Sequence, residues 1–156
     1  MKLRTGLAVV LIVALKGTAA AGQSEVDRAY AALSQRTRDI VETYLRTDCE
    51  IGEVGAALKP VLAVADSAKP YLIAVQRGGP PSAVLNDFQR GLESTWQARQ
   101  EYLKTRDARE LGNRSFEMMK AITKEQYLKE ESDAIQAKYR ERAALALRAM
   151  GAQKRK

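Results

Sequence analysis

The stretch "KPVLAVADSAKPYLIAVQRGGPP", residues 59 to 81, decides which fold class the chain can adopt. It holds two short apolar runs, each placed after a Lys-Pro pair, and runs of this length fit buried strands as well as buried helices. Counting by alternating threes and fours meets only apolar residues, so the helical phase continues through both prolines. These positions are Ile51, Val54, Leu58, Val61, Ala65, Ala68, Leu72 and Val75.

We therefore expect a buried, kinked helix or helix pair over these residues. Pro60 would kink the helix because proline lacks a backbone N–H, whereas Ser67 could cap a second segment with Pro70 in its tolerant first turn. The alternative is a strand hairpin in which "DSAKP" joins "VLAVA" to "YLIAV". The helical interpretation is favoured because an isolated hairpin is only marginally stable and both flanks have helical patterns.

Those flanks carry apolar stripes with helical spacing. We expect one helix from Glu25 to about Arg46, with Ser24 as its N-cap and Asp27 in its first turn. A second helix should begin at Ser82, directly after Gly78-Gly79-Pro80-Pro81, and it has the strongest amphipathic pattern in the chain. The stripe of the first is Val26, Ala29, Leu33, Ile40 and Tyr44, and that of the second is Leu85, Phe88, Leu92, Trp96 and Leu103.

The C-terminal third shows a shift in helical phase. The next stripe is offset by about 80° from the previous one, which predicts a break near residues 105 to 107. Asp107 with Glu110 resembles a capping box, and Thr123 with Gln126 is a candidate cap for a last helix that Gly151 would close. The apolar stripes are Leu111, Met118 and Ile122, then Leu128, Ile135, Tyr139, Ala146 and Met150.

Length and composition agree with a helical protein. The chain has 156 residues, 46% of them hydrophobic and only 6% aromatic, which is enough to bury one core. We expect an all-α, single-domain bundle of about five or six helices. The helical domain would span residues 22–150, with residues 151–156 as a basic flexible tail.

The first 21 residues have the pattern of a cleaved secretory signal peptide. Lys2 and Arg4 precede an apolar run from Leu7 to Leu15, and small residues ending at Ala21 follow. An uncleaved anchor is the alternative, but a membrane span needs about 20 apolar residues and Lys16 interrupts this run. Together with the Ala-rich, Arg-rich composition, this pattern favours export across the inner membrane of a bacterium into the periplasm.

Charge argues against a nucleic-acid partner. The full chain carries +7, but removing residues 1–21 leaves 23 basic against 19 acidic residues, or +4. Three of these charges are Lys154, Arg155 and Lys156, so residues 22–150 carry only +1. A nucleic-acid binder should have a basic stripe with stacking aromatics on its folded part. The basic tail could at most add weak, salt-sensitive peripheral attraction to an anionic membrane surface.

Cysteine and histidine usage restricts the chemistry. There is no His, and Cys49 is the single Cys, so an intramolecular disulfide and triads built on His are excluded. Cys49 could be a buried thiol or form an intermolecular disulfide. The carboxylates of Asp48 and Glu50 beside it disfavour a nucleophilic thiolate. We expect no catalytic residues, no cofactor and no metal site.

Two functions follow as predictions. The first is a non-enzymatic accessory protein that binds another envelope protein through an amphipathic helix face, with a homodimer left open. The alternative is a carrier of a hydrophobic small molecule or lipid in a pocket beside residues 61–75. Its candidate pocket residues are Leu62, Asp66, Lys69, Tyr71, Ile73 and Trp96. Carboxylate-based hydrolysis by Glu50, Glu53, Glu130 or Glu131 is a third candidate, although such acidic clusters are typical of exposed helix faces.

Overall fold

The computed structural model describes residues 25–47, 54–105 and 113–153, and within these ranges it contains seven helices and no strand. The expected all-α, single-domain fold is therefore confirmed. Residues 25–31 form a short first helix. It is followed by α2 (Gln35–Arg46), α3 (Val54–Ala63), α4 (Ala65–Gly78), α5 (Ser82–Thr105), α7 (Asn113–Ala121) and α8 (Lys124–Gln153).

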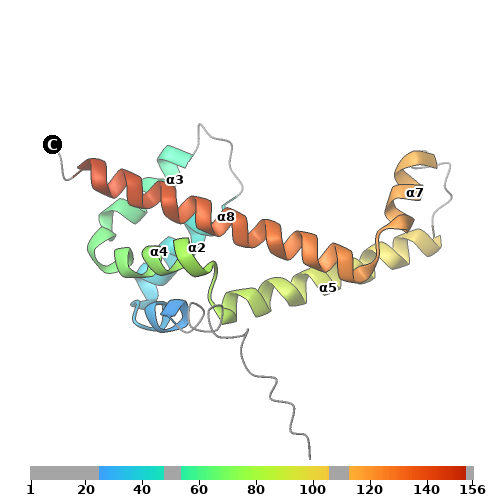
Figure 1. Ribbon diagram of the computed structural model, residues 1–156, viewed down its shortest axis with the longest axis horizontal. Coiled ribbons are helices and arrows are strands. Elements are labelled where there is room, and N and C mark those ends of the chain that lie inside the picture. Colours follow the sequence, from blue (N-terminus) through green and yellow to red (C-terminus); the bar gives the residue numbers. More distant parts are fainter. Residues whose placement is uncertain (1–24, 48–53, 106–112, 154–156) are drawn as a thin grey trace, which may run out of the picture.

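The helices divide the molecule into a body and an arm (Figure 1). The body consists of residues 25–31, α2, α3, α4 and the C-terminal half of α8. The arm is an antiparallel helix pair, formed by α5 and the N-terminal half of α8, with α7 standing at its far end. Since α8 runs through both parts, it fixes the arm to the body.

The hydrophobic core lies in the body. Helices α4 and α8 form its centre, and α2 and α3 pack against them. Three tyrosines, Tyr44, Tyr71 and Tyr139, are the largest fully buried side chains. The remaining buried apolar residues include Val26, Val41, Leu45, Val61, Ala68, Leu72, Val75, Ala143 and Ala146.

Residues 59 to 78 are helical apart from the turn at Val64, as the continuous stripe predicts, and the strand hairpin is not formed. Pro60 lies inside α3, and the break between the two helices occurs at Val64, where the Val64 N–H donates to the Val61 carbonyl and closes α3 with a tighter turn. Ser67 was expected to cap the second helix, but α4 begins at Ala65, and the Ser67 hydroxyl donates to the Val64 carbonyl. Pro70 is consequently the sixth residue of α4, beyond its first turn.

The single helix expected over residues 25–46 is in fact two helices. Ser34 interrupts it, because its side chain accepts a hydrogen bond from the Thr37 N–H and caps α2. The Arg38 guanidinium donates to the carbonyls of Tyr30 and Leu33 at the end of the preceding helix. These contacts let the chain turn sharply while the buried stripe keeps both helices on the core.

The starts of α5 and α8 and the end of α5 agree closely with the sequence patterns, but the end of α8 does not. Helix α5 begins at Ser82 and ends at Thr105, near the expected break, and the Gln126 N–H donates to the Thr123 hydroxyl as a cap of α8. The proposed cap at Asp107 and Glu110 lies outside the described residues. Helix α8 continues to Gln153, so Gly151 does not end it as predicted.

The connection between α4 and α5 depends on a glycine and on a long-range cap. Gly79 has a φ of 80°, a conformation that glycine adopts at little cost, and it turns the chain after α4. Asp27, from the first helix, accepts hydrogen bonds from the Ser82 backbone N–H at 2.7 Å and from the Ser82 hydroxyl at 2.8 Å. The N-terminus of α5 is thus capped by a carboxylate 55 residues away in sequence.

Candidate functional site

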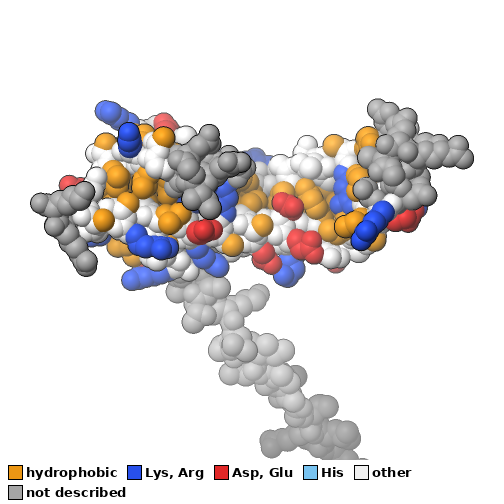
Figure 2. Space-filling model, turned by 90° about the horizontal axis from the view of Figure 1, so that it is seen from above, with side chains coloured by type: hydrophobic (Ala, Val, Ile, Leu, Met, Phe, Trp, Pro, Cys, Tyr) orange, Lys and Arg blue, Asp and Glu red, His pale blue; other side chains and the backbone are white. Residues whose placement is uncertain are grey.

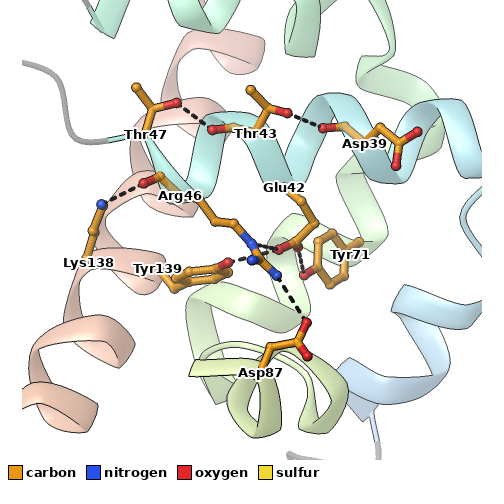
Figure 3. Close-up of polar contacts among 9 residues, drawn as sticks. All are labelled: Asp39, Glu42, Thr43, Arg46, Thr47, Tyr71, Asp87, Lys138 and Tyr139. Atoms are coloured by element: carbon orange, nitrogen blue, oxygen red, sulfur yellow. Dashed lines mark hydrogen bonds and ion pairs between the residues drawn. The ribbon is translucent and has the colours of Figure 1, made fainter. Parts of the chain in front are cut away.

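A buried polar cluster joins three helices of the body (Figure 3). Glu42 on α2 is only 8% exposed, and its two carboxylate oxygens accept hydrogen bonds from separate tyrosines. The Tyr71 hydroxyl on α4 donates at 2.6 Å, and the Tyr139 hydroxyl on α8 donates at 2.9 Å. The negative charge is therefore stabilised by short, charge-assisted bonds.

The environment of the cluster keeps both tyrosines protonated. Burial is the main reason that the pKa values of Tyr71 and Tyr139 lie well above 10, and the negative charge of Glu42 raises them further. The hydroxyls can consequently serve as hydrogen-bond donors throughout the physiological range. Because both hydroxyls face Glu42 inside the core, they hold helices together and are not presented to a substrate.

Arg46 connects this cluster to the root of the arm. Its Nε lies 3.4 Å from a Glu42 oxygen, an Nη lies 4.0 Å from Asp87 on α5, and the guanidinium stands 5.1 Å from the centre of the Phe88 ring. Burial tends to lower the pKa of Arg46, but its contacts with Tyr139 and Glu42 outweigh this effect and raise it. Arg46 thus links the charge in the core to the first turns of α5.

Sequence reasoning missed Glu42 and Arg46. The available signal was indirect: Tyr44 and Tyr139 occupy predicted core stripes, and a buried tyrosine hydroxyl needs a polar partner. The sequence does not show which residue this partner is, because Glu42 lies beside Tyr139 only once three helices have packed. The Tyr44 hydroxyl donates instead to the Arg142 backbone carbonyl. The partner of such a hydroxyl is therefore a property of the tertiary structure.

The arm carries an open groove between α5 and α8. The groove has a volume of about 430 Å³, and its apolar floor comes from Leu85, Phe88 and Leu92 on α5 with Leu128 and Ile135 on α8. Only Val84 is buried among the 24 residues of α5. Apolar side chains continue from the body along the arm, interspersed with charged ones (Figure 2). The apolar stripe of α5 is therefore only half covered. Contrary to the prediction, α5 is not the most amphipathic helix, since α2 is more strongly amphipathic.

A second cluster fixes the far end of the arm. The Trp96 and Tyr127 rings lie against each other with their centres 5.5 Å apart and their planes tilted by 36°, and the Arg99 guanidinium lies 5.0 Å from the centre of the Trp96 ring. Arg99 also donates to the Met119 carbonyl of α7. These contacts hold α7 against the arm, where Met118 is 68% exposed and is the only large apolar side chain so exposed among the described residues.

The structure separates the residues of the predicted carrier pocket. Tyr71 is fully buried in the body with its hydroxyl on Glu42, whereas Trp96 lies against Tyr127 in the arm. Leu62 and Ile73 are half-buried, and Asp66 and Lys69 are exposed on α4. Val61, Ala68, Leu72 and Val75 fill the core beside them. A carrier pocket beside residues 61–75 stays a prediction, but Trp96 lies in the arm and not beside these residues.

The other predicted site residues fall into two groups. Cys49, Glu50, Glu53 and the tail residues Lys154, Arg155 and Lys156 lie outside the described residues. Glu130 and Glu131 lie exposed on α8, where Glu130 accepts a hydrogen bond from Gln126. Within the described ranges, no group of three or more acidic or sulfur ligands is placed to hold a metal ion. None of the helices in these ranges is both long and apolar enough to cross a membrane.

Comparison with known proteins gives no relative from which a function could be transferred. No family model matches the chain, no curated protein matches it, and no solved structure resembles it.

Proposed function

We propose that this protein is a non-enzymatic accessory protein of the bacterial periplasm, which binds another envelope protein through α7, the tip of its arm. The observation that carries the proposal is the exposure of Met118 on α7, at the end of a helix pair that projects from the body. Methionine is used often at adaptable protein-binding surfaces because its flexible, polarisable side chain can fit different partners.

The tip is suited to binding because it is held firmly. Arg99 ties the Met119 carbonyl of α7 to α5, and the contact between the Trp96 and Tyr127 rings joins α5 to α8 beside it. On α7 itself, the Lys120 ammonium lies 5.2 Å from the centre of the Phe116 ring. A surface whose side chains are ordered in advance loses less conformational entropy when a partner binds.

The proposed location rests on the sequence. The signal-like residues 1–21 favour export, and the near-neutral charge of residues 22–150 favours a protein partner over a nucleic acid. The absence of His and the single Cys49 support a binding role because they remove the commonest catalytic groups.

The test is site-specific photo-crosslinking in the producing cell. A photoreactive residue would replace Met118 in one strain and the exposed Gln76 on α4 of the body in another. We expect one discrete protein adduct at position 118 and none at position 76. The purified partner should then bind the Met118→Lys variant about tenfold or more weakly. Equal adducts at both positions, or no adduct at position 118, would contradict the proposal.

A further inference from the structure

We infer that the groove between α5 and α8 is the interface of a homodimer, in which the arms of two copies pack into an antiparallel four-helix bundle. This surface lies between the body and the tip, so it is separate from the partner site proposed for α7. Two stacked helices form one layer and cannot cover both of their apolar faces, whereas two such pairs enclose a common core.

The apolar floor of the groove is large enough to be an interface with a second copy of the chain. After Val84, the next 21 residues of α5 contain no fully buried side chain, although Leu85, Phe88 and Leu92 follow the helical period. The arm face is about 30 Å long over Leu85–Leu103 and about 20 Å wide across two helices. Its area of about 600 Å² in projection is close to the roughly 800 Å² of accessible surface that each partner buries in a stable complex.

The polar rim indicates that the occupant is a second copy. In a twofold interface a residue close to the axis meets its own copy, so an unpaired charge there would face a like charge. The rim here consists of Asn86, Gln89, Ser132 and Gln136, which can both donate and accept hydrogen bonds. The single charge in the lining, Lys129, is neutralised by Asp133 of the same helix at 2.7 Å. A different partner would place no such restriction on the rim.

The charge of the whole arm is also compatible with self-association. Helix α5 carries three acidic and three basic residues, and residues 124–138 of α8 carry four acidic and three basic residues. The described part of the arm therefore has a net charge of −1. Two arms would repel each other only weakly at physiological ionic strength.

Sedimentation velocity of the processed chain tests this inference, with Cys49→Ser as the parent so that a disulfide cannot produce the dimer. We expect the parent to sediment as a dimer at micromolar concentration. Gln89→Lys places two lysines across the twofold interface and should weaken the dimer about tenfold or more. The matched control is Ser94→Lys, which adds the same charge to an exposed position of α5 about 180° from Leu85.

Two results would overturn the inference of a homodimer. A parent that remains monomeric up to about 100 µM, a concentration at which weak specific dimers form, overturns the inference. A dimer that Gln89→Lys and Ser94→Lys affect equally overturns it too. Circular dichroism must show that both variants keep the helix content of the parent. Because none of these variants touches α7, the result does not depend on the partner site at Met118.

Discussion

The Tyr139 hydroxyl on α8 donates a 2.9 Å hydrogen bond to Glu42 on α2, a residue 97 positions earlier in the chain. Tyr71 on α4 donates to the other oxygen of the same carboxylate. One buried charge therefore holds three helices in register. Since a polar group in a core costs free energy when it loses its partners, this cluster should dominate the response of the body to substitution.

Replacing the tyrosines should test this cluster directly. Tyr71→Phe and Tyr139→Phe each remove one donor to a buried carboxylate, and each should lower the free energy of unfolding by about 1.5–3 kcal/mol. Chemical denaturation monitored by circular dichroism measures the change. Tyr127→Phe is the control, because this half-buried residue lies in the arm, and its effect should stay within about 0.5 kcal/mol. Equal effects at all three positions would refute a special role for Glu42.

Removing the Glu42 carboxylate should lower the free energy of unfolding more than removing either tyrosine hydroxyl. Glu42→Leu leaves two buried hydroxyls without their acceptor, so we expect a loss of about 3 kcal/mol or more. The triple variant Glu42→Leu, Tyr71→Phe, Tyr139→Phe should be more stable than Glu42→Leu alone, because no buried polar group is then left unpaired. Additive losses in the triple variant would show that the tyrosines do not act through Glu42.

The raised pKa values of Tyr71 and Tyr139 predict a loss of stability in alkali. Their stabilising effect is complete below pH 10, the ordinary tyrosine pKa, and it decreases above this pH because only the unfolded chain ionises readily. Each tyrosine should contribute a slope of about 1.4 kcal/mol per pH unit. This slope is reached only where the unfolded tyrosines are ionised, so unfolding free energies measured above about pH 11 give it, and those at about pH 9 give the flat baseline. In Tyr71→Phe the slope should be less steep by the contribution of one tyrosine. An unchanged slope would show that the pKa of Tyr71 is not raised in the folded protein.

The long-range cap of α5 can be tested at Asp27. Asp27→Ala removes two hydrogen bonds to Ser82 and a favourable charge at a helix N-terminus, so it should cost about 1–2 kcal/mol. Glu101→Ala is the control, since Glu101 makes only an exposed ion pair with Lys104 within α5. Thermal unfolding compares the two variants. If Glu101→Ala is equally destabilising, the loss in Asp27→Ala reflects only the removal of a negative charge, and the cap of α5 by Asp27 is contradicted.

Arg99 should control the order of the tip. Arg99→Ala removes the hydrogen bond to Met119 and the contact with Trp96, so α7 should exchange its amide hydrogens faster. Trp96 fluorescence should shift to longer wavelength because its ring becomes more exposed to water. Hydrogen exchange read by mass spectrometry measures the amide exchange rates of α7 and of the body in the same experiment. Arg148→Ala, an exposed position at the opposite end of α8, is the control and should leave the exchange of α7 unchanged.

Sequence patterns found the helices well where the local signal was strong. The continuous stripe through residues 51–75 predicted helices despite two prolines, and the Gly-Pro run and Thr123 marked the starts of α5 and α8. The errors occurred where local interactions compete closely. Ser34 splits a stripe that looks continuous because its cap and the Arg38 contacts stabilise a turn, and the chain passes from α3 to α4 at Val64 through a single tighter turn.

The amino-acid sequence by itself determined the all-α class, because helical periodicity and caps are local properties that hold wherever the segments pack. Tertiary structure alone decided that Glu42 is buried between Tyr71 and Tyr139, that Asp27 caps α5, and that Tyr71 and Trp96 lie in separate parts of the molecule. These contacts join residues far apart in the chain, and their geometry depends on how whole helices cross. A one-dimensional pattern records which face of a helix is apolar, but not which helix will cover it.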